Sequence, residues 1–183
     1  MSDQYELRLA GAGGQGLILA GIILAEAAAV HDGKNAAQTQ SYGPEARGGA
    51  TRSEVIISDE EIIFPKVTAA DLLLALSQEA CEKYLPDLKE DGILVVDTVH
   101  VHDVPIAGAY ELPITSIAEE ATGRRITANM VALGAIVGLT DIVSRRAVEA
   151  AVANRVPEGT QELNLKALAA GFEAAKGLRK AAS

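Results

Sequence analysis

Apolar and polar residues follow two different periods along the chain, and together they predict alternating strands and helices. Short apolar or alternating runs are typical of strands, whereas longer runs with apolar residues three and four positions apart are typical of helices. This pattern predicts strands at Tyr5–Leu9, Asn35–Gln40, Thr51–Ser58, Glu61–Phe64, Ala70–Ser77, Gly92–Thr98 and Ala109–Ile114. It predicts helices at Leu17–Val30, Gln78–Leu88, Ser116–Thr122, Arg125–Val143, Ser144–Arg155 and Glu162–Leu178.

Three details of these elements are specific enough to test. A short polar turn separates two β-branched runs, so Thr51–Ser58 and Glu61–Phe64 are expected to form a hairpin. The first long helix is apolar almost all round, which indicates a buried helix, and it is expected to end near Gly33. Glu119 follows Ser116 at the spacing of a capping box.

The order of these elements predicts an α/β fold. Strands and helices alternate in the first part of the chain, and helices gather in the second. This order favours a Rossmann-like, doubly wound, mostly parallel sheet with an added β-hairpin and C-terminal helices. No internal repeat or low-complexity linker interrupts the chain, and 183 residues is a length typical of one domain. We therefore expect residues 1–183 to form a single domain.

Composition and charge narrow the class of function. A phosphate backbone would repel a chain of formal net charge −9, so we do not expect a nucleic-acid partner. The one cysteine, Cys81, cannot by itself form an internal disulfide, an iron–sulfur cluster or a structural zinc site. The N-terminal residues lack the pattern of a signal peptide, and the apolar runs are too short or too rich in Gly and Ala for a membrane span. We expect a cytoplasmic protein that does not enter a membrane.

A glycine-rich segment, GAGGQG, connects the first predicted strand to the first long helix. It satisfies the pattern GxGxxG, in which the first glycine allows a tight turn, the second lets the backbone approach a phosphate, and the third lets the helix lie close to the strand. Free N–H groups at the start of the helix would then point at an anion. The candidate ligand-binding residues of this segment are Gly11, Gly13, Gly14, Gln15 and Gly16. The alternative is a tight turn that binds no ligand.

A complete dinucleotide site is not expected at this segment. Such a site needs an acidic residue at the end of the second strand, about 20 residues beyond the glycines. Here Ala36–Ser41 contains no acid, and Asp32 precedes the strand. The chain also lacks the GxxxxGK(S/T) motif of P-loop nucleotidases. A phosphate of coenzyme A stays open as a ligand.

The most specific segment of the chain is SYGPEARGG, which follows the second predicted strand. Arg47 offers a guanidinium fork beside glycine N–H groups, an arrangement suited to a phosphate or a carboxylate, and Arg52 follows shortly after. Glu45 is placed to orient Arg47, and Tyr42 is placed to stack on a ring or to lie at an interface. The candidate residues here are Ser41, Tyr42, Gly43, Pro44, Glu45, Arg47 and Gly48. Ligand contact and contact with a partner subunit are both open.

Other polar residues have more ordinary explanations. His100 and His102 have no third ligand nearby, so solvated loop histidines are expected rather than a metal site. No basic residue adjoins Cys81, so a catalytic thiol is not expected. Asp97 ends a predicted strand, where it either lines a crevice or caps a turn.

The predicted helix Arg125–Val143 is rich in small residues, which indicates close packing against a partner. Gly134 and Gly138 would permit that approach. Thr127 and Asn129 at its start are expected to serve the core or an interface rather than to contact a ligand.

The two glycine-rich segments together mark a resemblance to a known family. GAGGQG after an N-terminal strand, then SYGPEARGG and ATRSEVIIS, resemble the gamma subunits of 2-oxoacid:ferredoxin oxidoreductases, the pyruvate/ketoisovalerate oxidoreductase gamma family. The later segments DLLLALSQEA, ILVVDT and ELNLKALAAGFEAAK fit the same family, and the similarity covers residues 5 to 178. The SYGPEARGG segment is similar to that of the 2-oxoglutarate (KorC-type) and branched-chain members, and we favour 2-oxoglutarate.

The resemblance implies a chain that works as one part of a larger enzyme. In this family other subunits carry thiamine diphosphate, Mg and 4Fe–4S clusters; the enzyme decarboxylates a 2-oxoacid, passes electrons to ferredoxin and transfers the acyl group to coenzyme A. It implies alpha and beta subunits as partners, a delta subunit in some enzymes, and ferredoxin through the complex, and it allows a homodimer of the isolated chain. The chain alone is expected to be inactive, with no catalytic or metal-binding residue. Both glycine-rich segments are implied to contact coenzyme A or partner subunits, with Arg47 as the expected anion contact.

Three alternatives stay open. The chain could serve a branched-chain 2-oxoacid or pyruvate enzyme instead. It could be a stand-alone nucleotide-binding module or dehydrogenase, although the missing ribose acid counts against this. It could also be a structural scaffold whose glycines serve protein contacts only.

Overall fold

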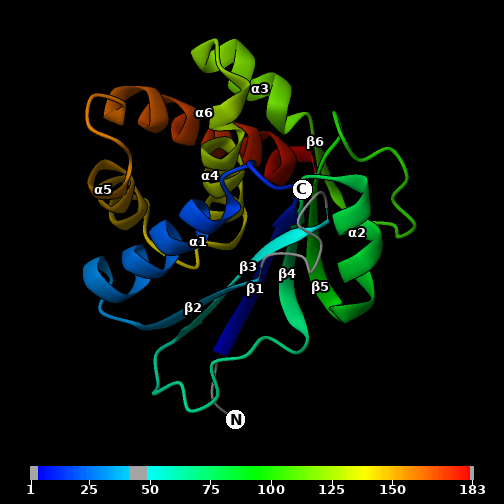
Figure 1. The fold of residues 1–183 in the computed structure, drawn as a ribbon, viewed down its shortest axis with the longest axis vertical. Coiled ribbons are helices and arrows are strands. Elements are labelled where there is room, and N and C mark those ends of the chain that lie inside the picture. Colours follow the sequence, from blue (N-terminus) through cyan, green and yellow to red (C-terminus); the bar gives the residue numbers. More distant parts are fainter. Residues whose placement is uncertain (1–3, 42–48, 182–183) are drawn as a thin grey trace.

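The computed structural model describes residues 4–41 and 49–181. Figure 1 shows that these residues form one twisted sheet with helices on both faces. The strands are β1 Gln4–Gly11, β2 Asn35–Ser41, β3 Thr51–Ser58, β4 Ala70–Ala75, β5 Leu88–Asp97 and β6 Tyr110–Leu112. The helices are α1 Leu17–Glu26, α2 Gln78–Tyr84, α3 Ile114–Thr122, α4 Ala128–Thr140, α5 Arg145–Arg155 and α6 Gln161–Ala181, with short helical turns η1 Ala27–His31, η2 Leu85–Asp87 and η3 Arg125–Thr127.

The sheet is mixed, with the strand order β2-β3-β1-β4-β5-β6. β1, β4, β5 and β6 run parallel, and β3 lies antiparallel between β1 and β2. The β1–β3 register pairs Gly11 with Thr51 and Gln4 with Ser58. All described strands except β3 therefore run in one direction, which confirms the predicted mostly parallel α/β fold.

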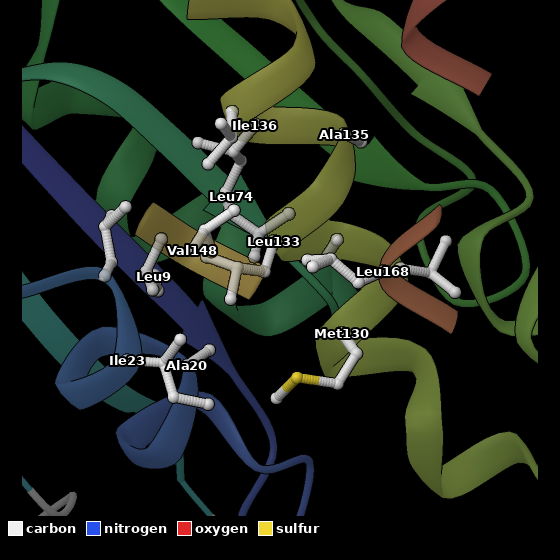
Figure 2. Close-up of a cluster of buried hydrophobic side chains, with 14 of the residues drawn as sticks. Leu9, Ala20, Ile23, Leu74, Met130, Leu133, Ala135, Ile136, Val148 and Leu168 are labelled. Carbon is white, nitrogen blue, oxygen red and sulfur yellow. The ribbon is translucent and has the colours of Figure 1, made fainter. Parts of the chain in front are cut away.

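The core has two main parts because successive side chains of a strand point to opposite faces of the sheet. The larger part lies between the sheet and α1, α4, α5 and α6, and Figure 2 shows Leu9, Ile23, Leu133 and Val148 meeting there. The smaller part lies on the opposite face under α2, where Cys81 is buried. No helix within residues 4–41 and 49–181 is both long enough and apolar enough to cross a membrane.

Helices α4 and α6 cross at very short range because glycines lie at the crossing. A Cβ atom built on Gly134 would lie 2.1 Å from the carbonyl oxygen of Leu168, and one built on Gly171 would lie 2.1 Å from that of Val131. A Cβ on Gly138 would lie 2.7 Å from the Cβ of Ala175. The prediction that Gly134 and Gly138 permit close packing is confirmed, and the partner is the last helix of the same chain.

The predicted hairpin between Thr51–Ser58 and Glu61–Phe64 is wrong. Residues 61–64 form no strand. Strand β3 already pairs with β1 along one side and with β2 along the other, so neither edge remains for a third strand. The added hairpin is instead formed by β2 and β3, which pair from Asn35–Ser58 to Ser41–Arg52.

Two helix predictions differ from the structure for local reasons. The capping box of Ser116 and Glu119 is wrong, because α3 begins at Ile114 and no side chain caps its N-terminus. The helix predicted over Gln78–Leu88 ends at Tyr84. The turn η2, which contains a proline, follows it and leads directly into β5. The helix predicted over Leu17–Val30 is confirmed in its position, although its last residues form the wider turn η1.

Candidate functional site

The predicted glycine-rich segment lies at the carboxyl edge of the sheet, between the end of β1 and the start of α1 (Figure 1). Gly14 has φ 85° and Gly16 has φ 74°, a left-handed conformation that glycine adopts without steric cost. These two residues reverse the chain so that α1 can return along the sheet. We call residues 11–16 the glycine loop.

Gln15 holds the glycine loop in shape from within the protein. Its Oε1 accepts a 2.7 Å hydrogen bond from the N–H of Ala12, and its Nε2 donates one of 3.0 Å to the carbonyl oxygen of Leu76, just after β4. A Cβ on Gly11 would lie 2.2 Å from the Gln15 Oε1, so a side chain at position 11 would displace this clamp. Gln15 therefore uses both polar atoms of its amide on the protein itself.

Gly16 meets the start of α4 rather than a strand. The Asn129 side chain donates a 3.1 Å hydrogen bond from Nδ2 to the carbonyl oxygen of Gly16, and a Cβ on Gly16 would lie 2.4 Å from that Nδ2. The role predicted for the third glycine is therefore wrong. The close approach of helix to strand occurs at Gly21, where a Cβ would lie 2.1 Å from Ser53 Oγ of β3.

The middle of the glycine loop faces open space. Among the described residues, no atom lies within 4 Å of a Cβ built on Gly14, and the one atom near a Cβ on Gly13 is Thr51 Oγ1, at 3.9 Å. Within the described ranges, the N–H groups of Gly13 and Gly14 have no hydrogen-bond partner. Such N–H groups at the start of a helix are donors suited to an anion.

Three adjoining hollows surround the glycine loop. The first, of about 360 Å³, lies against the β4 and β5 ends and is lined by Gly14, Gln15, Leu76, His100, Thr115, Arg125, Ile126 and Ala128. The second, of about 300 Å³, lies against the starts of α4 and α6 and is lined by Gly14, Gly16, Leu19, Arg124, Ile126, Thr127, Asn129, Pro157, Thr160, Leu163 and Asn164. The third, of about 410 Å³, lies beside Thr51 and is lined by residues 12–18 with Thr51.

Two arginines that sequence reasoning did not single out stand beside these hollows. Arg124 and Arg125 lie in and next to the turn η3, between α3 and α4. Arg125 pairs with Glu119 at 2.9 Å, with both side chains exposed, whereas the Arg124 guanidinium forms no ion pair in the part of the chain that the structure describes. Thr127 secures the turn by donating a 2.8 Å hydrogen bond to the carbonyl oxygen of Arg124. The sequence feature that could have identified them is the pair of consecutive arginines directly after Gly123, just before a buried helix.

The strand beside β1 differs from the one that a dinucleotide-binding fold has at this place. The acidic residue of such a site comes from a second parallel strand directly beside the first. Here the antiparallel β3 occupies that place, so the end of β2 lies two strands away from β1. Thr51 stands next to Gly11, and Asp32 accepts hydrogen bonds from the N–H and hydroxyl of Ser144 at the start of α5.

Several predicted residues have structural roles. Asp97 is buried and accepts hydrogen bonds from the N–H groups of Val99 and Thr115 and from the Thr115 hydroxyl, so it fixes the turn after β5. Burial raises the pKa of the Cys81 thiol, with smaller contributions from Glu82 and Asp103, which keeps the thiol protonated. No group of three or more His, Cys, Asp or Glu side chains able to hold a metal occurs in residues 4–41 and 49–181.

The second predicted segment is described only at its two ends. Ser41 ends β2 and pairs with Arg52 across the hairpin. The other candidates fall outside the described residues: Tyr42, Gly43, Pro44, Glu45, Arg47 and Gly48. On the far side, the Ala50 carbonyl oxygen accepts a 3.4 Å hydrogen bond from the hydroxyl of Tyr84 in α2.

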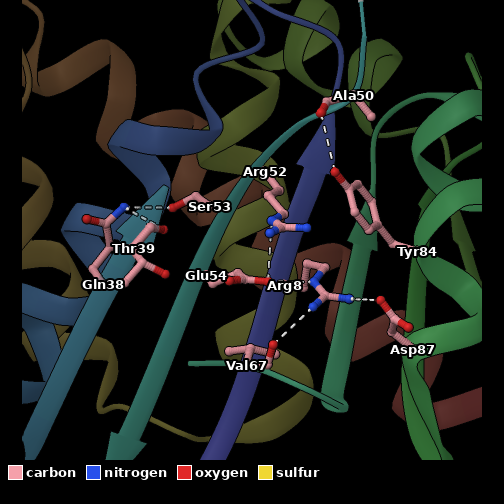
Figure 3. A network of polar contacts seen from close by, with 10 residues as sticks. All are labelled: Arg8, Gln38, Thr39, Ala50, Arg52, Ser53, Glu54, Val67, Tyr84 and Asp87. Carbon is pink, nitrogen blue, oxygen red and sulfur yellow. Dashed lines mark hydrogen bonds and ion pairs between the residues drawn. The ribbon is translucent and has the colours of Figure 1, made fainter. Parts of the chain in front are cut away.

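Figure 3 shows a partly buried polar network next to this hairpin, centred on the buried Arg8 and Glu54. Arg8 donates from Nε to Glu54 Oε1 at 2.8 Å and from Nη1 to Asp87 at 2.8 Å. Arg52, which follows the SYGPEARGG segment, is 3.6 Å from Glu54 and lies over the Tyr84 ring at 5.6 Å. Arg52 is therefore engaged with the protein and is a weaker candidate for an anion than Arg124.

The geometry defines an α/β domain with a donor-rich, partly cationic carboxyl edge, and comparison places it in a family. Residues 6–174 match the sequence model of the pyruvate ferredoxin/flavodoxin oxidoreductase family. The chain belongs to this family.

Particular relatives refine that assignment. The chain is 53% identical over 178 residues to 2-oxoglutarate synthase subunit KorC from Methanocaldococcus jannaschii, which covers 94% of this chain and 95% of the relative. The gamma subunit of a keto/oxoacid ferredoxin oxidoreductase from Geobacter sulfurreducens matches with a TM-score of 0.85 and 55% identity, over 94% of this chain and 99% of that one. A 2-oxoglutarate:ferredoxin oxidoreductase from Magnetococcus marinus, solved with 2-oxoglutarate, coenzyme A and succinyl-CoA bound, matches with a TM-score of 0.84 and 25% identity, over 97% of this chain and 32% of that one. The resemblance stated from the sequence is confirmed.

Proposed function

We propose that the chain is the gamma subunit of a 2-oxoglutarate:ferredoxin oxidoreductase, and that its carboxyl edge contacts coenzyme A. The observation that carries the proposal is the glycine loop, whose Gly13 and Gly14 N–H groups are unpaired among the described residues and whose Gly14 lines the same hollow as Arg124. The relation to KorC over nearly the full length of both chains supports 2-oxoglutarate as the 2-oxoacid.

The residues around the hollows fit the chemistry of coenzyme A. Its phosphates need cationic and N–H donors, which Arg124, Arg125 and the glycine loop offer. Its pantetheine arm is largely apolar with two amides, and Ile126 and Leu19 provide exposed or partly exposed apolar surface at the same place. Coenzyme A would supply the thiol that accepts the acyl group, and this chain would position the cofactor.

The proposal assigns no acid–base or metal chemistry to this chain. Thiamine diphosphate, Mg and the 4Fe–4S clusters are expected on alpha, beta and any delta subunits, and the complex would donate electrons to ferredoxin in the cytoplasm. The work left to this chain is orientation, in which a small displacement of a bound group can cost much of the rate. Gln15 and Asn129 would serve that work indirectly by fixing the glycine loop.

Reconstitution tests the proposal. The chain is mixed with its own alpha and beta partners, and reduction of ferredoxin is followed with 2-oxoglutarate, with pyruvate and with 3-methyl-2-oxobutanoate, each with and without coenzyme A. We expect the complete mixture to be active with 2-oxoglutarate and to depend on coenzyme A. Full activity without this chain would refute the subunit assignment, and a preference for pyruvate or the branched-chain acid would refute the substrate.

Arg47 keeps its predicted role within this proposal. Arg47→Ala is expected to raise the apparent KM for coenzyme A or to weaken assembly, since it removes a guanidinium from the most specific segment of the chain. An intact complex with unchanged kinetics would refute that role. Tight binding of NAD or FAD by the isolated chain, measured by calorimetry, would favour a stand-alone nucleotide-binding module instead.

A further inference from the structure

Two large apolar side chains project from the end of the molecule opposite the glycine loop. The segment from residue 59 to residue 69 connects β3 to β4, and we call it the 59–69 loop. It leaves β3 at Ser58, which pairs with Gln4 at the start of β1, whereas the glycine loop leaves the end of β1 (Figure 1). Ile63 is 89% exposed and Phe64 is 63% exposed. The chain has only two Phe residues, so exposing one of them on a loop needs an explanation.

The 59–69 loop is held at both ends, so these two side chains are presented by a fixed backbone. At its start, the Glu60 N–H donates to Ser58 Oγ at 3.0 Å. At its end, Val67 is buried against Ile56 and Ala70, and its carbonyl oxygen accepts a 3.3 Å hydrogen bond from Arg8.

Between these anchors, one apolar side chain points inward and the next two point outward. Ile62 packs against the small core cluster of Ile56, Val67 and Ala70, while Ile63 and Phe64 point to solvent. The Lys66 N–H donates to the Phe64 carbonyl oxygen at 2.9 Å and closes a tight turn behind the two side chains. Two large apolar side chains on a loop that is held at both ends are typical of an interface anchor, because little loop entropy is lost when they bind.

The charges beside the apolar pair specify the partner. Asp59, Glu60 and Glu61 precede it and Lys66 follows it; all four are exposed and form no ion pair within residues 4–41 and 49–181, so the surroundings of the pair are acidic on balance. A second copy of this chain, docked through the same surface, would bring two such acidic stretches together, and the net charge of −9 would add to that repulsion. The surface therefore fits a different chain, with an apolar pocket bordered by basic side chains.

We propose that Ile63 and Phe64 dock the chain into an apolar, basic-rimmed pocket on another subunit of the same oxidoreductase. This inference rests on the proposed function, since it requires partner subunits. The requirement for further chain agrees with the Magnetococcus marinus polypeptide, of which the chain matches 32%, because an equivalent domain is covalently joined to further chain there.

The binding constant between this chain and the remaining subunits tests the inference. The chain is labelled with a fluorophore and titrated with the complex that lacks it, for the wild type, for Ile63→Ser/Phe64→Ser, and for the control Val30→Ser. Val30 is 69% exposed on η1 and matches the pair in chemistry and exposure. We expect the double variant to raise Kd at least about tenfold, the range of interface anchors, and the control to stay within about threefold, the range of surface changes.

A charge variant and a footprint complete the test. Glu60→Gln/Glu61→Gln should also weaken binding, and its binding should depend less on salt, because most of the attraction to the basic rim is lost. Hydrogen exchange of the wild-type complex should show protection in residues 59–69. This footprint decides the case even if a variant misfolds.

The outcomes separate this inference from the proposed function. Equal Kd values for the wild type and the double variant, or no protection of residues 59–69, would overturn the inference and leave the subunit assignment standing. A wild-type chain that binds none of the subunits would overturn both. Loss of self-association by the double variant, with unchanged binding to the other subunits, would assign the surface to a second copy and overturn the inference.

Discussion

Gln15 shows that a residue within a ligand-binding motif can have a structural role instead. Gln15 belongs to the GxGxxG segment, yet its side-chain amide forms hydrogen bonds with Ala12 and with Leu76. Leu76 is 61 residues further along the chain. A sequence pattern contains no information on such a distant partner. The position of the loop could be predicted from the alternation of apolar and glycine residues, whereas the direction of the Gln15 side chain could not.

The first prediction concerns Gln15. Gln15→Ala removes two neutral hydrogen bonds, each worth about 1 kcal/mol net, so the free energy of unfolding should fall by about 1–2 kcal/mol. Urea denaturation of the isolated chain measures this change. Gln40→Ala, at an exposed glutamine of β2, is the control and should change stability by less than about 0.5 kcal/mol. Unchanged stability with a raised KM for coenzyme A would mean that Gln15 serves the ligand and not the loop.

The buried pair of Arg8 and Glu54 gives the second prediction. Their exposed fractions are 3% and 7%, so removing one partner leaves the other charge buried. Arg8→Met should lower the free energy of unfolding by about 3 kcal/mol, the low end of the cost of breaking a buried ion pair, because Glu54 keeps only the more distant Arg52, at 3.6 Å. Arg8→Met/Glu54→Leu should recover much of this loss because both charges are then absent.

Guanidinium denaturation of the single and double variants measures the coupling between Arg8 and Glu54. Arg125→Met is the matched control, because Arg125 and Glu119 form a 2.9 Å pair with both side chains more than half exposed. An exposed pair contributes about 0–1 kcal/mol. A double variant as unstable as Arg8→Met would show that the contacts of Arg8 with Asp87 and Val67 matter more than its contact with Glu54.

At the scale of elements, most strands and helices followed from their apolar periods, and the error in the predicted hairpin has a non-local cause. Residues 61–64 have the composition of a strand, but a strand needs a free sheet edge, and β3 has none. The same insertion of β3 places the hairpin with β2 at one side of the sheet. Periodicity describes which face of an element is buried, and it does not describe which neighbour the element meets.

The arginines of η3 were missed for the same reason. Arg124 is more than 100 positions from the glycine loop in the sequence, and the fold alone brings the two to the same hollow. Asn129 connects the same two parts of the chain directly, because its side chain donates a hydrogen bond to Gly16, 113 residues away. The small residues of α4, in contrast, were a local signal and predicted close helix packing correctly.

The third prediction uses two glycines of α6 that differ only in their surroundings. Gly171→Ala places a methyl group where the Val131 carbonyl oxygen would be 2.1 Å away, so α4 and α6 must separate. Overpacking of this kind costs about 1–3 kcal/mol. A methyl group at Gly177 would have no described atom within 4 Å, so Gly177→Ala should instead stabilise the helix by up to about 1 kcal/mol. Thermal unfolding of both variants, followed by circular dichroism, checks the pair, and the same sign for both would contradict the packing argument.

At the scale of the whole molecule, the sheet separates two surfaces of different chemistry. The carboxyl edge presents N–H donors and arginines, and the amino end presents Ile63 and Phe64 beside three acids. β1 spans the distance between them with eight residues, or about 25 Å. That distance exceeds the Debye length of about 8–10 Å at ordinary salt, so a charge removed at one end should not be felt at the other.

This separation gives the last prediction: a variant at one end of the sheet should change only the KM for coenzyme A, and a variant at the other end should change only the Kd for the subunits. Arg124→Ala removes a guanidinium from the glycine-loop hollow and should raise the apparent KM for coenzyme A about tenfold in the assembled enzyme. A lost charge-assisted hydrogen bond of about 1.5–3 kcal/mol is enough for this change, since about 1.4 kcal/mol corresponds to a factor of ten. Its Kd for the other subunits should stay the same.

Ile63→Ser/Phe64→Ser should show the opposite pattern. Its Kd for the other subunits should be higher, and its KM for coenzyme A should be unchanged once the subunits are saturating. Arg146→Ala, on α5 beside His31, is the control for removing an arginine and should change neither quantity. Coenzyme A titrations at saturating subunit concentration and subunit titrations at saturating coenzyme A measure the two constants independently. If each variant changed both constants, the two ends of the sheet would act as one surface, because docking at the amino end would then also set the position of the glycine loop.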